Sequence, residues 1–174
     1  MRRLGGPVVA DQLVAQGVDT VFGVPGESFL TVLDGLWEQR DTIRFVTARH
    51  EATASHMAEA WGKLTGRPGV CLATRGPGAT QAAIGVHTAF QDSTPMILLL
   101  GQVERGHLGR EAFQEVDFEA MFAPLAKWAK QIESADDIPA VMAQAFELAL
   151  ADRPGPVVLA LPEDMQRDFT AAPD

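Results

Sequence analysis

Short apolar runs alternate with longer stretches of helical periodicity along the chain, and a Gly or Pro stands at each switch. Most of the apolar runs are nearly uninterrupted, which is typical of parallel strands buried on both faces of a sheet. We therefore expect an α/β fold, doubly wound, with a mainly parallel six-stranded sheet and helices on both faces. The expected strands span residues 20–23, 43–48, 70–74, 96–101, 128–132 and 157–161.

The segments between these runs predict the helices. They span residues 7–16, 29–38, 52–64, 79–90 and 138–151, with a shorter helix near 118–122. Gly66 is placed to end the third helix, and Asp136 is placed to cap the last one. A chain of 174 residues suits one domain, which we assign to residues 1–168, with 169–174 as the start of a linker or tail.

Composition excludes several classes of partner. The formal net charge is −9 and the Lys and Arg residues form no basic stripe, so we expect no nucleic acid partner. No apolar run reaches membrane-spanning length and no charged-then-apolar leader is present, so we expect a cytoplasmic protein with no membrane association. The single Cys71 lies in an apolar run and is predicted to be a buried strand residue, and no metal ligands are predicted.

Four familiar motifs are excluded. Gln81 replaces the third glycine of a dinucleotide fingerprint, and no phosphate loop ending in Gly-Lys-Ser/Thr is present. Ala54 stands where a zinc-protease helix needs its second histidine. Leu30 stands where a nucleophile elbow after Ser28 needs glycine.

Three features remain, and each follows one of the first three expected strands. They are the run GVPG at 23–26, RHE at 49–51, and TRGPG at 74–78. Open α/β sheets bind ligands at the carboxyl ends of their strands, and glycine lets the backbone approach a ligand closely. The three features therefore describe a narrow slot beside the Glu51 carboxylate. Spacing alone leaves an ordinary reading open, in which Glu51 is an acid in a first helical turn and the glycines form tight βα turns.

The ordered series of motifs resembles that of acetolactate synthases. The matching runs are VFGVPG at 21–26, RHE at 49–51, HMAE at 56–59, TRGPGAT at 74–80, PM at 95–96, GQV at 101–103, AFQE at 112–115, KW at 127–128, RPGPV at 153–157 and LPED at 161–164. They cover nearly the whole chain. Together they are specific for the pyrimidine-binding domain of the thiamine-diphosphate family, which includes acetolactate synthases, pyruvate oxidases and related decarboxylases.

The resemblance implies a role for particular residues. Glu51 would hydrogen-bond a ring nitrogen of the aminopyrimidine and promote the imino form that removes the thiazolium proton. Phe113 and Gln114 resemble a substrate-side loop, although a surface loop with one anchored aromatic is the alternative. His50 and His56 are expected to be structural. The residues expected to bind the cofactor are Pro25, Gly26, Glu51, Thr74, Gly78 and Gln81.

Two departures from the family pattern concern substrate choice. The family motif often reads SGPGATN, whereas this chain has Arg75 and Gln81 at the changed positions. Both positions border the cofactor or a subunit interface in the family. The resemblance therefore leaves the substrate open, because several reaction types share the catalytic glutamate.

The half of the site that holds the diphosphate is absent from this sequence. The family binds Mg²⁺ and the cofactor phosphates through a Gly-Asp-Gly run in a second domain, and no such run occurs here. We therefore expect thiamine diphosphate to be held by its pyrimidine half only, with Mg²⁺ bound through the diphosphate-binding domain of the same or another chain. FAD is a further candidate cofactor of the full-length enzyme.

The resemblance implies decarboxylation of a 2-oxo acid followed by acetolactate-synthase-like carboligation, in a homo-oligomer. The chain alone is expected to be inactive. Two alternatives stay open. One is a natural subunit of a two-chain 2-oxo acid decarboxylase, and the other is a non-catalytic α/β binding module.

Overall fold

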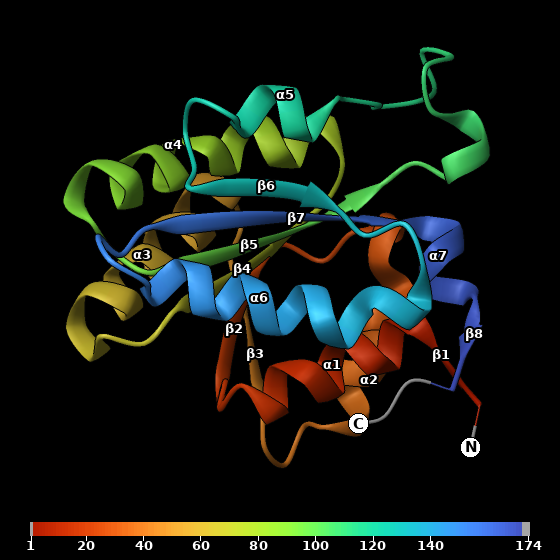
Figure 1. The fold of residues 1–174 in the computed structure, drawn as a ribbon, viewed down its shortest axis with the longest axis horizontal. Helices are drawn as coiled ribbons and strands as arrows, with labels where there is room; N and C mark the ends of the chain where they lie inside the picture. Colours follow the sequence, from red (N-terminus) through yellow and green to blue (C-terminus); the bar gives the residue numbers. More distant parts are fainter. Residues whose placement is uncertain (1, 172–174) are drawn as a thin grey trace.

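The structure, a computed structural model, describes residues 2–171, and its centre is one parallel sheet (Figure 1). The strand order is β3-β2-β4-β5-β7-β6, and every neighbouring pair is parallel. The strands are β2 (Thr20–Gly23), β3 (Arg44–Thr47), β4 (Gly69–Ala73), β5 (Met96–Gln102), β6 (Trp128–Gln131) and β7 (Pro156–Pro162). The predicted doubly wound α/β class with a parallel six-stranded sheet is confirmed.

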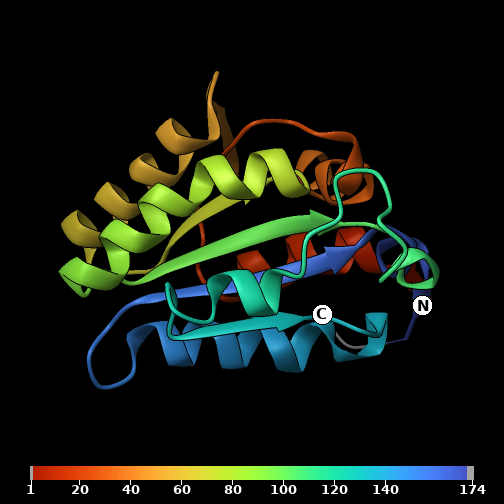
Figure 2. The same ribbon diagram turned by 90° about the horizontal axis from the view of Figure 1, so that it is seen from above.

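Helices cover both faces of the sheet (Figure 2). One face carries α1 (Gly5–Ala15), α2 (Leu30–Glu38) and α6 (Ile138–Leu150), and the other carries α3 (Glu51–Thr65), α4 (Gly76–Asp92) and α5 (Phe118–Phe122). Alternate strand side chains supply the two cores, because successive residues of a strand point to opposite faces. In β4, Val70 and Leu72 join the first core, while Cys71 and Ala73 join the second.

Several short elements lie outside this sandwich. Strands β1 (Arg3–Leu4) and β8 (Phe169–Thr170) form a small antiparallel pair. Strand β8 belongs to the segment expected to begin a linker, and residues 172–174 of that segment lie outside the described part of the chain. The remaining elements are the 3₁₀ turns η1 (Glu27–Phe29), η2 (Arg105–His107) and η3 (Ala135–Asp137) and the helix α7 (Glu163–Arg167).

The helix ends confirm one predicted cap and correct another. Gly66 ends α3 with a left-handed backbone (φ 69°), as predicted. The prediction that Asp136 caps α6 was wrong, because Asp136 lies inside the turn η3 that leads into the helix. Ser134 caps that turn by accepting a hydrogen bond from the Asp136 N–H, and the Asp136 carboxylate accepts one from the Thr170 hydroxyl.

The strand order fixes where a ligand can bind. The chain adds β3 on one side of β2 and then adds β4 on the other side, so the winding direction reverses between β2 and β4. The segments after these two strands therefore leave in opposite directions at the carboxyl edge of the sheet, and this position is the usual ligand site of such folds. Within residues 2–171, no helix is long and apolar enough to cross a membrane.

Candidate cofactor site

Glu51 is the first residue of α3 and follows the carboxyl end of β3. The His50 side chain caps this helix, since its Nδ1 accepts a hydrogen bond from the Ala52 N–H at 3.1 Å. One turn further along α3, His56 Nδ1 lies 2.7 Å from the Ala52 carbonyl oxygen. Both histidines thus bond within their own helix, in line with the structural roles predicted for them. The carboxylate of Glu51 is left half-buried at the edge of the sheet.

The two glycine-containing segments predicted to flank Glu51 approach each other through Thr74, and Gly78 lies beside Glu51. A Cβ built at Gly78 would lie 3.3 Å from Glu51 Oε1 and 3.0 Å from Thr74 Cγ2. A Cβ built at Gly26 would lie 2.8 Å from Thr74 Cβ. The turns after β2 and β4 therefore approach each other at the switch point, with one carboxylate beside them. Because positions 26 and 78 have no Cβ, the Thr74 and Glu51 side chains lie close against the main chain there, an arrangement that suits a flat, hydrogen-bonding ring.

The start of α4 differs from the sequence prediction. The run Gly76-Pro77-Gly78 was expected to be a turn before a helix beginning at Ala79, but the helix already begins at Gly76. Proline is favoured in the first turn of a helix, so Pro77 does not oppose this start. Glycine is required at 76 by close contact and not by an unusual backbone angle, because a Cβ there would lie 2.8 Å from the Gln114 carbonyl oxygen. At 78 a Cβ would make tight contacts with the Thr74 and Glu51 side chains.

Ser28 connects the segment after β2 to the segment after β4. Its side chain is fully buried, and its hydroxyl lies 2.8 Å from the Thr74 hydroxyl. Gln166 of α7 donates a 2.8 Å hydrogen bond to the Ser28 carbonyl. Sequence reasoning rejected Ser28 as a nucleophile but assigned it no other role, because its partners lie 46 and 138 positions away. The structure shows that it fixes the turn after β2 to the turn after β4.

Two of the predicted cofactor residues lie at the margin of this cluster. Pro25 is exposed and adjoins Gly26 in the turn after β2. Gln81 is exposed on α4, and within residues 2–171 no hydrogen bond joins it to Glu51, Thr74 or Gly26. Their contact with a cofactor remains a prediction.

The predicted substrate-side loop lies beside the same helix start. The Gln114 carbonyl accepts a 2.9 Å hydrogen bond from the Gly76 N–H, and Gln114 has a left-handed backbone (φ 64°). Phe113 is 71% exposed. The Glu115 carboxylate accepts hydrogen bonds from the N–H groups of Gly109 and Ala112, which hold the loop closed and lower the pKa of Glu115. The loop is thus tied to the start of α4 through Gln114, and it leaves the Phe113 ring exposed.

Neither thiol chemistry nor a protein-only metal site is supported nearby. Cys71 is fully buried in β4 as predicted, and burial, followed by the charge of Glu51, raises the pKa of its thiol far above the usual range. Among the described residues, no group of three or more His, Cys, Asp or Glu side chains could hold a metal ion.

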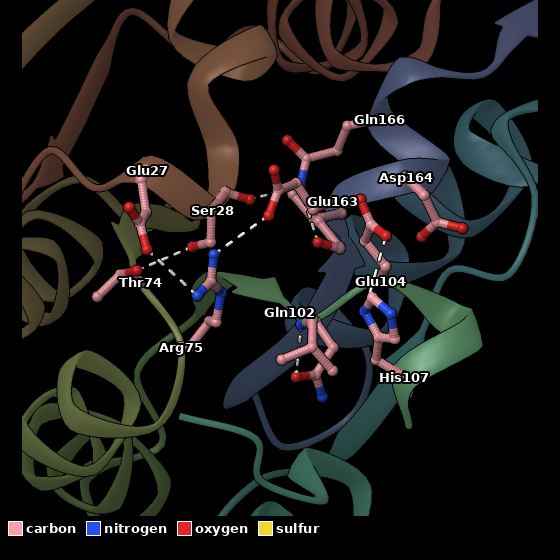
Figure 3. Close-up of polar contacts among 12 residues, drawn as sticks. Glu27, Ser28, Thr74, Arg75, Gln102, Glu104, His107, Glu163, Asp164 and Gln166 are labelled. Atoms are coloured by element: carbon pink, nitrogen blue, oxygen red, sulfur yellow. Dashed lines mark hydrogen bonds and ion pairs between the residues drawn. The ribbon is translucent and has the colours of Figure 1, made fainter. Parts of the chain in front are cut away.

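A further charged residue at this edge was not assigned a role from the sequence. Arg75 lies between Thr74 and Gly76, is buried, and forms ion pairs with Glu27 and Glu163 (Figure 3). The sequence showed only that Arg75 departs from the family pattern. Its partners could not be identified because they follow other strands, 48 and 88 positions away.

Comparison with known proteins agrees with this geometry. The family model described as "Thiamine pyrophosphate enzyme, N-terminal TPP binding domain" matches residues 3–121. The chain therefore belongs to the thiamine pyrophosphate enzymes, as an N-terminal cofactor-binding domain of that family.

Within that family, the chain is similar to acetolactate synthases over nearly its whole length. It is 39% identical over 172 residues to the large subunit of Parasynechococcus marenigrum, covering 97% of this chain and 28% of the relative. It is 41% identical over 175 residues to the large subunit of Corynebacterium glutamicum, covering 99% and 28%. With the mitochondrial catalytic subunit of Saccharomyces cerevisiae the identity is 40% over 161 residues, covering 92% and 23%. The chain thus spans about a quarter of the length of these relatives.

Proposed function

We propose that this chain forms the pyrimidine-binding, cofactor-activating half of a thiamine-diphosphate-dependent enzyme that decarboxylates a 2-oxo acid and joins the product to a second carbonyl compound, as an acetolactate synthase does. The observation that carries the proposal is the position of the Glu51 carboxylate against Gly78 and Thr74 at the switch point of the sheet. The similarity to acetolactate synthases supports the reaction type.

The residues present fit the pyrimidine half of the cofactor. The cluster combines one carboxylate with backbone that a Cβ at Gly26 or Gly78 would obstruct. When bound, thiamine diphosphate supplies the electron sink for decarboxylation and for transfer of the two-carbon fragment. Glu51 would hydrogen-bond a ring nitrogen and hold a proton at its carboxylate. Gly26, Thr74 and Gly78 would set the plane of the ring against the main chain.

Reconstitution tests this proposal. Mixed with or joined to a diphosphate-binding domain, thiamine diphosphate and Mg²⁺, the chain should release carbon dioxide from pyruvate, whereas neither part alone should do so. Carbon dioxide release and formation of an acetolactate product are measured separately, because a decarboxylase would give only the first. If cofactor binding and turnover both stay absent after the second domain is supplied, a non-catalytic binding module becomes the better description.

The isolated chain should bind thiamine diphosphate weakly. The slot offers a few contacts to the pyrimidine, and the described residues include no metal-binding group for the diphosphate. We expect a dissociation constant well above about 1 µM in calorimetry with Mg²⁺. Addition of the diphosphate-binding domain should tighten binding. Micromolar or tighter binding by the chain alone would place the phosphate site within these residues and contradict the proposed division of the site.

Assembly with a second subunit is also part of the proposal. Large apolar side chains are exposed on the elements that form the carboxyl edge of the sheet, including Phe113 at 71% and Leu30 at 58%. Such side chains are suited to burial against a partner. We expect a dimer or larger homo-oligomer for the complete enzyme in sedimentation experiments. A monomer that persists at high protein concentration while catalysing the reaction would contradict this expectation.

A further inference from the structure

Thr74 lies between the two glycines of the candidate slot, and its rotamer decides which group it presents to each of them. A Cβ built at Gly78 would lie 3.0 Å from Thr74 Cγ2 and 3.3 Å from Glu51 Oε1. A Cβ built at Gly26 would lie 2.8 Å from Thr74 Cβ and 3.0 Å from Thr74 Oγ1. The methyl group of Thr74 therefore faces Gly78 on the side of Glu51, and its hydroxyl faces the turn after β2.

Ser28 holds the Thr74 hydroxyl in that direction (Figure 3). The two hydroxyl oxygens lie 2.8 Å apart, and the Ser28 side chain is fully buried. Among residues 2–171, each hydroxyl has the other as its one hydrogen-bond partner. The rotamer of Thr74 thus depends on a single contact made by a residue that lies behind the slot.

Ser28 itself has little room to move. Its carbonyl accepts a 2.8 Å hydrogen bond from Gln166 Nε2, which also donates to the Leu161 carbonyl at 2.8 Å. A Cβ built at Gly101 would overlap the Ser28 hydroxyl, so this hydroxyl lies directly against the backbone of β5. A serine anchored through its main chain and packed against a strand offers its hydroxyl in one place. It can therefore select one rotamer of its partner.

A different rotamer of Thr74 would change the surroundings of Glu51. Threonine has three staggered positions about χ1, and one of the other two places Oγ1 where Cγ2 now lies. The hydroxyl would then face Gly78 on the side of the Glu51 carboxylate. From there it could donate a hydrogen bond to the carboxylate, directly or through one water molecule. Such a bond stabilises the charged form, so Glu51 would be less able to hold the proton that it shares with the cofactor ring.

We propose that Ser28 is a positioning residue that holds the Thr74 hydroxyl away from Glu51 and so leaves the carboxylate free for the cofactor. This inference rests on the proposed function and deepens it, because it adds a residue that acts on Glu51 through Thr74. Since its side chain is fully buried, Ser28 has this effect without touching the cofactor.

The Thr74 rotamer is the first test, and it uses this chain alone. Three-bond couplings from the Thr74 methyl carbon to the backbone nitrogen and carbonyl carbon report χ1 in an isotope-labelled sample. In the parent they should match the rotamer that directs the hydroxyl to Ser28. In Ser28→Ala they should shift to a different rotamer, because the hydroxyl has lost its partner.

Proton exchange is the second test, made in the complete enzyme, meaning this chain together with its diphosphate-binding domain. Ser28→Ala should slow hydrogen–deuterium exchange at the thiazolium carbon roughly tenfold, comparable to the net effect of one hydrogen bond to a charged group. Ser55→Ala is the matched control, since Ser55 is also fully buried and its hydroxyl bonds to the Ala52 carbonyl within α3. That variant should exchange the proton at the parent rate.

A second substitution separates positioning from a general loss of structure. Valine has the shape of threonine but no hydroxyl that can turn toward Glu51. The double variant Ser28→Ala/Thr74→Val should therefore regain most of the exchange rate that Ser28→Ala loses. If the hydrogen bond acted only as a tie between two turns, the double variant would stay as slow as Ser28→Ala, because the tie is absent from both.

Three results would overturn the inference. They are an unchanged Thr74 rotamer in Ser28→Ala, exchange at the parent rate in that variant, and a double variant that regains none of the lost rate. Failure of the proposed function is seen separately. If Glu51→Gln exchanges the proton as fast as the parent, the proposed function fails, and the inference fails with it whatever rotamer Thr74 adopts.

Discussion

Replacement of Glu51 by Gln in the complete enzyme should slow hydrogen–deuterium exchange at the thiazolium carbon by a factor on the order of a hundred or more, comparable to the loss of general acid–base help. Glutamine keeps the shape and can hydrogen-bond the ring, but it cannot carry the proton shared with the pyrimidine. Cofactor affinity should therefore change little. Exchange is followed by NMR after rapid mixing in deuterium oxide, and affinity by calorimetry.

A control separates this role from that of a helix-terminal charge. Glu119 is an exposed acid in the first turn of α5, as Glu51 is an acid in the first turn of α3. Loss of either charge costs at most about 1 kcal/mol through the helix dipole. Glu119 Oε1 also accepts a hydrogen bond from the Gln131 N–H and lies 3.8 Å from Lys130 Nζ. Glutamine can keep that hydrogen bond and an exposed ion pair contributes little, so Glu51→Gln and Glu119→Gln should both have small effects on unfolding. Only Glu51→Gln should slow exchange. Exchange at the parent rate in Glu51→Gln would leave Glu51 as no more than a helix-terminal acid.

The sequence predicts the position of the site better than its detailed structure. Nearly continuous apolar runs identify a parallel sheet, and the carboxyl ends of such strands meet at one edge. Gly26, Glu51 and Gly78 each follow a predicted strand, and the structure places Gly26 and Gly78 against Thr74 and Gly78 beside Glu51. Glycine and proline spacing alone could not show that Gly76 already begins a helix, because the same residues are common in turns and in first helical turns.

The polar contacts that tie the edge together are beyond sequence-based prediction. Arg75 forms ion pairs with Glu27 and Glu163, and Ser28 forms hydrogen bonds with Thr74 and Gln166. Each of these contacts joins segments that follow different strands of the sheet. Periodicity places a residue on an element and on one of its faces, but it does not say which charged side chains from separate turns meet. The incorrect cap at Asp136 has the same origin, because Asp136 lies in the turn η3 and its carboxylate bonds to Thr170 of β8, 34 positions away.

The close packing of α3 against α4 is what places Glu51 opposite Gly78. Ser55 lies one turn after Glu51 in α3, and Gly85 lies two turns after Gly78 in α4, so each pair shares a helix face. A Cβ built at Gly85 would lie 2.6 Å from Ser55 Cβ and 2.7 Å from the Ser55 carbonyl carbon. The two helices can approach this closely only because position 85 has no side chain.

Gly85→Val should therefore wedge the two helices apart. We expect the free energy of unfolding to fall by about 3 kcal/mol, as over-packing of a tight core contact does, measured by urea denaturation. His87→Val, at an exposed position of the same helix, controls for placing a valine in α4 and should cost less than about 1 kcal/mol. Valine is a better helix former than the glycine it replaces at position 85, so a loss of stability there comes from packing. Because the wedge also separates Glu51 from Gly78, folded Gly85→Val enzyme should exchange the thiazolium proton at least about tenfold more slowly than the parent, in line with the sensitivity of catalysis to displacements of about 1 Å. Parent-like exchange in a destabilised but folded Gly85→Val enzyme would show that the helix contact holds the fold together without setting the geometry of the site.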